Sequence, residues 1–385
     1  MKKALLAIAA CMALAGQASA ADGVKLYGIA DVGFEHFSGI NVGTPAAPRS
    51  GSINQLGSGS ESASRIGIRG NEDLGGGLNV FFTLETGFCA AGMNQAGANS
   101  SGYCSADGFM QRQSLIGLHG AFGTIRAGKM YTLSFIDEVA LVDPFHWFLT
   151  GNYGNMSPLL VFGNGSAAQA ADGKPVVPFQ FVRLDQSVQY ETPNLHGLKL
   201  AGAYVFRANP GTAVSSSPSK AMELSAVYHS GPVLLGASYA SISQMQNFGA
   251  AFSNGAKATN WHVFGGYDFK VADVTGLYQK TSVDGLKGSA KSWLLGASVP
   301  LGANTVMASL SQTTNDLWSA QQTKSTQIAL GLSHALSKRV DLYTSYSHIS
   351  NSDGGALAVG DGTAAFLGVA NQAASGFNLG MRYRF

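Results

Sequence analysis

The sequence predicts an all-β protein, a 16-stranded antiparallel transmembrane β-barrel, and three observations lead to that fold class. Apolar and polar residues alternate along many segments of about ten residues, the length that a tilted strand needs to cross a bilayer. Glycine is abundant (50 of 385 residues), and only 12% of the residues are charged, against about 25% in soluble domains. Short and long connections also alternate along the chain, as they do in outer-membrane barrels.

Charge and hydropathy exclude other classes of protein. Lys and Arg number 24 and Asp and Glu number 22, a formal net charge of +2. Nucleic acid is therefore not an expected partner, because phosphate contacts need many basic residues. A run of about 18 apolar residues, which a transmembrane helix would need, is also missing from the sequence.

The first 20 residues have the pattern of a cleaved export signal. Lys2 and Lys3 provide a basic start, residues 4–16 are apolar and uncharged, and Ala18-Ser19-Ala20 is a small-x-small cleavage site. We therefore expect residues 21–385 to form the mature barrel. Its net charge would be zero, because the signal removes two lysines and no acidic residue.

Sixteen segments carry the strand pattern. In the last of them, 375–385, Phe377, Leu379, Met381 and Tyr383 alternate with polar, cationic and glycine residues. The predicted strands, in chain order, are 24–34, 61–70, 78–84, 110–119, 124–130, 182–190, 198–206, 220–229, 232–241, 259–269, 272–281, 290–299, 303–312, 325–334, 339–349 and 375–385.

The connections between these segments are of two kinds. Short turns at 72–77, 120–123, 193–197, 230–231 and 336–338 interleave with longer polar loops at about 38–60, 89–109, 131–180, 208–219, 242–258, 313–324 and 350–374. The short turns predict the periplasmic rim and the long loops the extracellular rim. We expect Phe385 to close the barrel by pairing the last strand with the first, because an open sheet edge in lipid would leave backbone groups unsatisfied.

Two cysteines remain once the signal, with Cys11, is removed. We expect Cys89 and Cys104 to form a disulfide in an oxidising compartment, contributing about 3 kcal/mol for a loop of about 15 residues. Neither a C-x-x-C pair nor a zinc-type His pair accompanies them. The sequence predicts no metal site and no cofactor, although a divalent ion at an acidic loop is left open.

No catalytic residues are expected either. The eight histidines are scattered and accompany no recognisable nucleophile motif, so we expect no enzyme activity. The alternative to a channel is a surface adhesin or receptor that uses the long extracellular loops. Conductance in planar bilayers would separate these two functions.

Five motifs occur in an order typical of one family. They are Tyr27-Gly28-Ile29-Ala30-Asp31, the stretch 64–78 (SRIGIRGNEDLGGGL), Gly117-Leu118 followed by Phe122-Gly123-Thr124, the stretch 187–193 (SVQYETP), and Met381-Arg382-Tyr383-Arg384-Phe385. The chain thereby resembles the trimeric general porins of Gram-negative bacteria, of the β-proteobacterial type.

The resemblance implies an outer-membrane homotrimer, in contact with outer-membrane lipid and lipopolysaccharide. It also implies a water-filled channel through which small hydrophilic solutes and ions diffuse passively. In such channels the third extracellular loop folds inward to narrow the pore. The connection 131–180, the longest in this chain, suits that role.

Eight charged residues are candidates for the pore constriction. Asp137, Glu138 and Asp143 lie on the inward loop, and Arg65, Arg69, Arg112, Lys129 and Arg183 lie on or beside the second to sixth strands. Alternation places Arg183 and the Arg65/Arg69 pair on polar faces, whereas Arg112 and Lys129 rest on the family resemblance. Opposed acids and bases would create a transverse field across the pore. Five bases against three acids predict a weak preference for anions.

The trimer contact is expected on the early and late strands. Gly28, Ala30, Gly33 and Gly67 near the start, with Gly376 and Gly380 near the end, would shorten the barrel wall locally and let neighbours pack closely.

Overall fold

The computed structural model describes residues 23–44, 47–92, 110–157, 168–169, 175–176, 182–206, 220–245, 256–317, 322–361 and 366–385. The predicted signal peptide, residues 1–20, lies outside these ranges. The strands are β1 (Lys25–Asn41), β2 (Ser50–Ser58), β3 (Arg65–Asp73), β4 (Asn79–Gly87), β5 (Gln113–Gly120), β6 (Gly123–Tyr131), β7 (Ala168–Gln169), β8 (Pro175–Val176), β9 (Arg183–Glu191), β10 (Leu198–Val205), β11 (Lys220–Ser230), β12 (Val233–Met245), β13 (Ala256–Asp268), β14 (Asp273–Val283), β15 (Ala290–Leu301), β16 (Asn304–Asn315), β17 (Thr323–Ala335), β18 (Val340–Ser352) and β19 (Ala374–Arg384).

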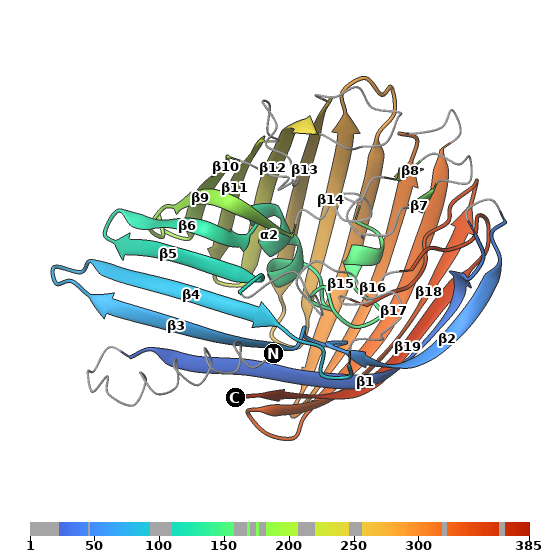
Figure 1. Cartoon of the computed structure of the whole chain (residues 1–385), viewed down its shortest axis with the longest axis horizontal. Coiled ribbons are helices and arrows are strands. Elements are labelled where there is room, and N and C mark those ends of the chain that lie inside the picture. The colour runs from blue at the N-terminus through green and yellow to red at the C-terminus, as the bar shows by residue number, and fades with distance from the viewer. Residues whose placement is uncertain are drawn as a thin grey trace, which may run out of the picture.

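The strands form a closed antiparallel barrel (Figure 1). From β3 to β6 and from β9 to β19 each strand pairs with the next, and β6 pairs with β9. The short strands β7 and β8 form a separate two-stranded sheet. The barrel closes where β1 pairs with β19, from Ile29↔Arg384 to Ser38↔Ser375. Phe385 completes this closure, because its backbone N–H donates to Gly28 O and its carbonyl accepts from Gly28 N, both at 3.0 Å. β2 and β3 pair with the two halves of β1 and together occupy one strand position in the barrel. The barrel therefore has the 16 strand positions that the sequence predicts.

The strand position that β2 and β3 share differs from its predicted form. The expected long loop at 38–60 is mostly strand, because β1 continues to Asn41 and β2 runs back from Ser50. The interruption comes later, at residues 59–64, which we call turn 59–64. Asp31 causes this break, because its carboxylate accepts hydrogen bonds from the backbone N–H groups of Glu61 (3.0 Å) and Ser62 (2.7 Å), which therefore cannot join a sheet ladder.

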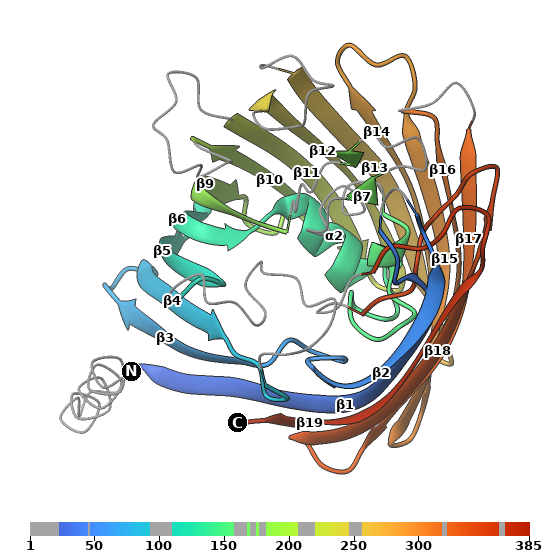
Figure 2. The same ribbon diagram turned by 45° about the vertical axis from the view of Figure 1, so that its right-hand side comes forward.

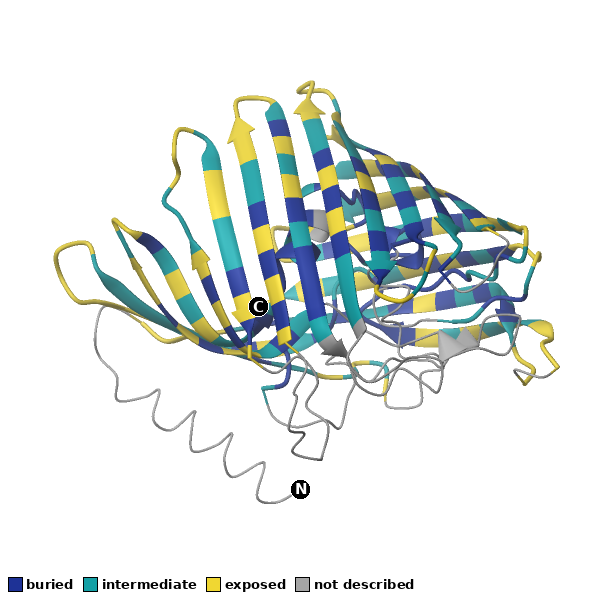
Figure 3. Cartoon of the chain, turned by 90° about the horizontal axis from the view of Figure 1, so that it is seen from above, coloured by how far each residue is buried: buried dark blue, intermediate teal, exposed yellow. Residues whose placement is uncertain are grey.

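Alternate residues along each strand face opposite environments, and Figure 3 shows the resulting bands of buried and exposed positions. On β19, Leu379 is 53% exposed, whereas the neighbouring Asn378 is completely buried. The predicted apolar face of this strand is therefore the outer face, and its Asn and Arg residues point inward. Such a pattern suits a barrel whose outside contacts lipid.

The connection between β6 and β9 folds into the barrel, as Figure 2 shows for helix α2 (Leu133–Leu141). Its described inner part is residues 132–157, which we call loop 132–157. This loop also contains the 3-10 helix η1 (Tyr153–Asn155). The inward position predicted for the third long connection is confirmed. No helix among the described residues is long and apolar enough to cross a bilayer.

Most of the glycines expected to form the trimer contact face the barrel interior instead. A Cβ on Gly33 would lie 2.8 Å from the Tyr343 hydroxyl, and one on Gly380 would lie 2.2 Å from it. Gly33 and Gly380 are paired in the β1–β19 register. The buried Tyr343 side chain therefore fits only because neither position carries a Cβ. These glycines make room for a side chain inside the barrel, and they carry no argument for a trimer contact.

Candidate functional site

Three arginines gather around one tyrosine at the end of β6. The Tyr131 hydroxyl accepts hydrogen bonds from Arg112 Nη2 at 2.8 Å and from Arg183 Nη2 at 2.7 Å. The Arg183 guanidinium also lies 4.3 Å from the centre of the Tyr131 ring. Arg65 is close enough to Tyr131 and to both arginines to interact with them electrostatically. We call Arg65, Arg112, Arg183 and Tyr131 the arginine cluster.

Glu85 on β4 is the acid that holds this cluster in place. Its carboxylate pairs with Arg112 Nε at 2.8 Å and accepts a hydrogen bond from the Tyr27 hydroxyl at 2.9 Å. Arg112 and Glu85 are both almost completely buried. A buried charge needs a partner of opposite sign, so Glu85 allows Arg112 to lie inside the wall.

The other two predicted bases lie near this cluster in different settings. The Arg69 guanidinium stands 5.2 Å from the centre of the Tyr27 ring, two residues along β3 from the inward-facing Gly67. Lys129 Nζ forms an ion pair with Asp185 at 2.9 Å. All five predicted bases therefore belong to the wall formed by β3, β5, β6 and β9 and their ends.

Local irregularities explain why strict alternation misjudged some of these residues. Arg112 precedes the first residue of β5, so strand parity does not decide its direction. The β6–β9 register shifts between Gly128 and Met130, and Gln186 has a positive φ of 51°. As a result Leu184 and Ser187, which differ in parity, are both buried.

The predicted acids occupy different positions from those expected. Asp143 is only 2% exposed. Its carboxylate accepts hydrogen bonds from the backbone N–H groups of Phe145 (3.0 Å), Trp147 (2.9 Å) and Tyr153 (3.0 Å). It fixes the shape of loop 132–157, so it does not face the bases across open water. Burial raises the pKa of Asp143, against these hydrogen bonds and the nearby His146.

Asp137 is also buried, on the barrel side of helix α2. It accepts hydrogen bonds from Ser225 Oγ at 2.7 Å and from the Ser238 hydroxyl. Burial raises the pKa of Asp137 to about 6, although both serines favour its charged form. The side chain of the third predicted acid, Glu138, lies outside the described part of the chain.

Loop 132–157 is fastened to the barrel at both ends. The buried Glu223 on β11 accepts hydrogen bonds from the N–H groups of Leu133 (2.9 Å) and Ser134 (3.0 Å), the first residues of α2. At the other end, Thr150 N–H donates to Ser345 Oγ on β18 at 2.9 Å, and Gln327 on β17 donates to Gly151 O at 3.1 Å.

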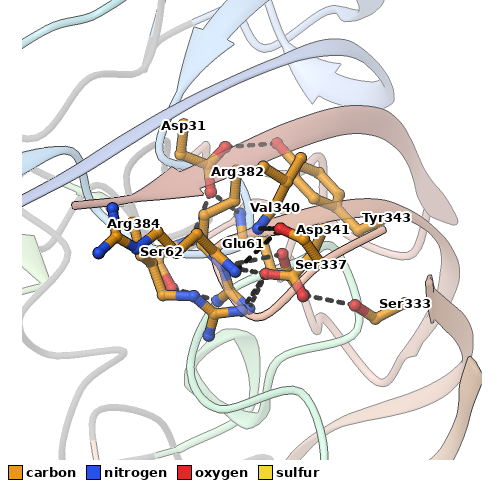
Figure 4. Close-up of polar contacts among 11 residues, drawn as sticks. Asp31, Glu61, Ser62, Ser333, Ser337, Val340, Asp341, Tyr343, Arg382 and Arg384 are labelled. Carbon is orange, nitrogen blue, oxygen red and sulfur yellow. Dashed lines mark hydrogen bonds and ion pairs between the residues drawn. The ribbon is translucent and has the colours of Figure 1, made fainter. Parts of the chain in front are cut away.

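Turn 59–64 joins the far end of this loop to the last strands. Leu149 N–H donates to Ser60 O. Figure 4 shows the charges beside it: Arg382 pairs with Glu61 (3.3 Å) and Asp341 (3.0 Å), while Arg384 also contacts Asp341. Burial raises the pKa of Glu61, and Arg382 opposes that shift. Sequence reasoning did not identify this network, since its members are far apart in the chain.

Taken together, the described charges are unevenly distributed around the barrel. The wall near the arginine cluster carries five bases (Arg65, Arg69, Arg112, Lys129 and Arg183) and two acids, Glu85 and Asp185. Sequence analysis missed Tyr131 and Glu85. The only available signal for Glu85 was an acid within an otherwise uncharged strand.

Two further expectations concern cysteine and metal. Cys104 lies outside the described residues, so the Cys89–Cys104 disulfide stays a prediction. Among the residues that the structure describes, no three His, Cys, Asp or Glu side chains come together as a metal site.

A closed barrel with an apolar outer face, an inward loop and a charged interior defines a transmembrane channel protein. The model of the Gram-negative porin family matches residues 5–354, so this chain belongs to that family and to the outer membrane. Outer membrane porin protein 32 of Delftia acidovorans is 30% identical over the whole of both chains. An outer membrane porin protein of Bordetella pertussis is 28% identical, again over the whole of both.

Solved structures agree with this assignment. An anion-selective porin from Comamonas acidovorans superposes with a TM-score of 0.73 at 28% identity, covering 95% of this chain and all of that one. The trimer form of Vibrio cholerae OmpT has a TM-score of 0.65 over 95% of this chain and all of that one. Its identity is 15%, so this likeness shows the fold alone.

Proposed function

We propose that this chain forms a passive, water-filled pore for small hydrophilic solutes and ions, with a preference for anions. One observation carries the preference: the wall at the arginine cluster has an excess of three positive charges, while Asp137 and Asp143 are buried within loop 132–157 and its contacts. In a narrow passage of low dielectric constant, such an excess of positive charge interacts strongly with passing ions. The similar Comamonas channel is described as anion-selective, which supports the proposal.

Reconstitution in planar bilayers tests both parts. Folded protein should give ohmic current steps at low voltage, and the complete absence of conductance would refute the pore. In a KCl gradient the reversal potential should report anion selectivity. Arg183→Glu removes one positive charge and adds a negative one, so it should shift the reversal potential toward cation selectivity.

The matched control is Lys338→Glu, at an exposed turn outside the barrel interior. It changes the total charge by the same amount and should leave the reversal potential unchanged. Clear cation selectivity of the wild type, or equal shifts in both variants, would contradict the proposed role of the arginine cluster.

The remaining parts of the proposal concern assembly. We propose a homotrimer, embedded in outer-membrane lipid and lipopolysaccharide, with residues 1–20 removed and Cys89 joined to Cys104. The resemblance to the trimeric porins implies this oligomeric state, and OmpT, which shares the fold, is itself described in a trimer form. Passage requires no chemical step, so we assign no catalytic residue.

A further inference from the structure

A column of three aromatic rings leads from loop 132–157 to the arginine cluster. The rings of Tyr131 and Phe135 are stacked, with their centroids 5.3 Å apart and an angle of 6° between their planes. The Trp147 ring meets the Phe135 ring edge-on, at 5.2 Å and 72°. Phe135 belongs to α2, which lies inside the barrel (Figure 2). We call Trp147, Phe135 and Tyr131 the aromatic column.

Arg183 stands at the wall end of this column. Its guanidinium lies 4.3 Å from the centre of the Tyr131 ring, and Tyr131 and Arg183 are directly paired in the β6–β9 register. Val182 and Leu184, on either side of Arg183 in sequence, are buried in the same apolar cluster as Phe135 and Trp147. One ring therefore contacts both a cation of the arginine cluster and a ring of the inward loop, and both kinds of contact are attractive.

The backbone at the loop end of the column has an uncommon conformation. Trp147 has a φ of 69° and its neighbour His146 has a φ of 51°. Bulky residues rarely adopt this left-handed conformation, which persists only where surrounding contacts enforce it. Here the Asp143 carboxylate supplies such a contact, because it accepts the Trp147 N–H at 2.9 Å. Asp143, which the sequence predicts as a pore acid, thereby fixes the backbone that carries the Trp147 ring.

Simple apolar packing would require volume at position 135 but no particular ring geometry. Phe145 has a role of that kind, since it is buried in a different apolar cluster of the same loop. The Phe135 ring, in contrast, lies parallel to a ring whose hydroxyl accepts hydrogen bonds from Arg112 and Arg183. A shift of the Phe135 ring would therefore move Tyr131 and, with it, both guanidinium groups.

We propose that Phe135 is a positioning residue for anion selectivity: its ring, backed by Trp147, holds Tyr131 and thereby the guanidinium groups of Arg112 and Arg183 in place. The inward loop then acts on selectivity through ring contacts, without contributing a charge of its own there. The inference rests on the proposed function, because it concerns the same arginine cluster. It adds to that function a residue that is uncharged and buried.

Phe135→Leu tests this role, because leucine keeps apolar volume but has no flat ring to stack on Tyr131. Doubling the distance between a guanidinium and a passing anion from about 4 Å to about 8 Å halves their attraction. Even in a water-like dielectric, this lowers the relative permeability of the anion about twofold. We therefore expect the chloride-to-potassium permeability ratio, obtained from reversal potentials in a KCl gradient, to fall about twofold in the variant.

Phe145→Leu is the matched control, because it makes the same change to another buried ring of the same loop. It should lower the thermal stability of the barrel but keep the wild-type permeability ratio. Bilayer recordings need few channels, so a reduced refolding yield of either variant does not prevent the comparison. Equal ratios in the wild type and Phe135→Leu, or equal reductions in both variants, would overturn the positioning role.

A double-mutant cycle separates positioning from a general change in the pore. Arg183→Gln removes the guanidinium at the wall end of the column. Adding Phe135→Leu to this variant should therefore lower the permeability ratio by a smaller factor than it does in the wild type. If the two substitutions act by independent factors, Phe135 does not act through Arg183 and the proposal is wrong.

The wild-type measurement distinguishes this proposal from the proposed function. A wild type that conducts without anion selectivity would refute the proposed function and the positioning role together. An anion-selective wild type whose permeability ratio is unaffected by Phe135→Leu would refute the positioning role alone.

Discussion

The Tyr131 hydroxyl accepts hydrogen bonds from two arginines, and this makes it the residue that sets the shape of the arginine cluster. Tyr131→Phe should keep the ring contact with Arg183 but release both guanidinium groups from a common acceptor. We expect anion selectivity to persist, since no charge is lost, while single-channel current becomes noisier as the arginines change position. Single-channel recordings at fixed salt would check this, and complete loss of selectivity would contradict it.

Asp137 should make the stability of the barrel depend on pH. Its pKa is raised by burial to about 6 in the folded protein, above about 3.9 for an unfolded chain. The folded state therefore binds the proton more tightly, and this contribution to stability is present at low pH and is lost as pH rises from about 4 to about 6.

Asp137→Asn should remove that component, which amounts to about 3 kcal/mol for a shift of about two pH units. Thermal unfolding of both proteins between pH 4 and pH 7 would measure it as a difference in slope. Identical slopes in the two proteins would count against the buried position of Asp137.

Loop 132–157 depends on its anchors at the scale of the structural element. Glu223→Ala leaves the first two N–H groups of α2 without their acceptor, at a cost of about 1–3 kcal/mol for each buried group. We expect a lower unfolding temperature and larger current fluctuations, because the inward loop loses its attachment to β11. Glu191→Ala is the control: its partners Arg126 and Lys199 are partly exposed, so its effect on unfolding should stay under about 1 kcal/mol.

The elements were largely predictable, because lipid on the outside enforces strict alternation. Strands such as β14–β18 match their predicted ranges within a few residues. The division of the second barrel strand into β2 and β3 was not predictable. It depends on the Asp31 carboxylate, which accepts hydrogen bonds from N–H groups about 30 residues away in the chain.

For the candidate site, the side on which the bases gather was predicted, but the role of the acids was not. Charge and spacing cannot tell an acid that faces water from one that folds its own loop, as Asp143 does.

Barrel closure and assembly belong to the whole molecule. Phe385 contributes two backbone hydrogen bonds to Gly28, and its ring fills the space beside that glycine. Deleting Phe385 should therefore reduce the yield of folded protein while leaving the selectivity of the molecules that do fold unchanged. Refolding yield followed by gel mobility, together with reversal potentials, measures both; an undiminished yield would argue against its role in closure.

Oligomeric state needs a separate measurement. We expect the native protein in detergent to have the mass of three chains. Mass determination by light scattering, corrected for bound detergent, would show this, and the mass of one chain would refute the trimer.

Turn 59–64 has a consequence for the order of events during biogenesis. Its neighbours arrive from opposite ends of the chain: the Tyr343 hydroxyl donates to Asp31 across 312 residues, and Arg382 donates to Ser62 across 320. Contacts with such sequence separation are slow to form. Until the final hairpin arrives, Asp31 lacks the Tyr343 hydroxyl of β18 and Glu61 lacks the Arg382 guanidinium of β19, so a chain truncated before β18 should remain unable to bury these two acids. We therefore expect the buried acids of turn 59–64 to be accommodated only once the C-terminal strands have paired.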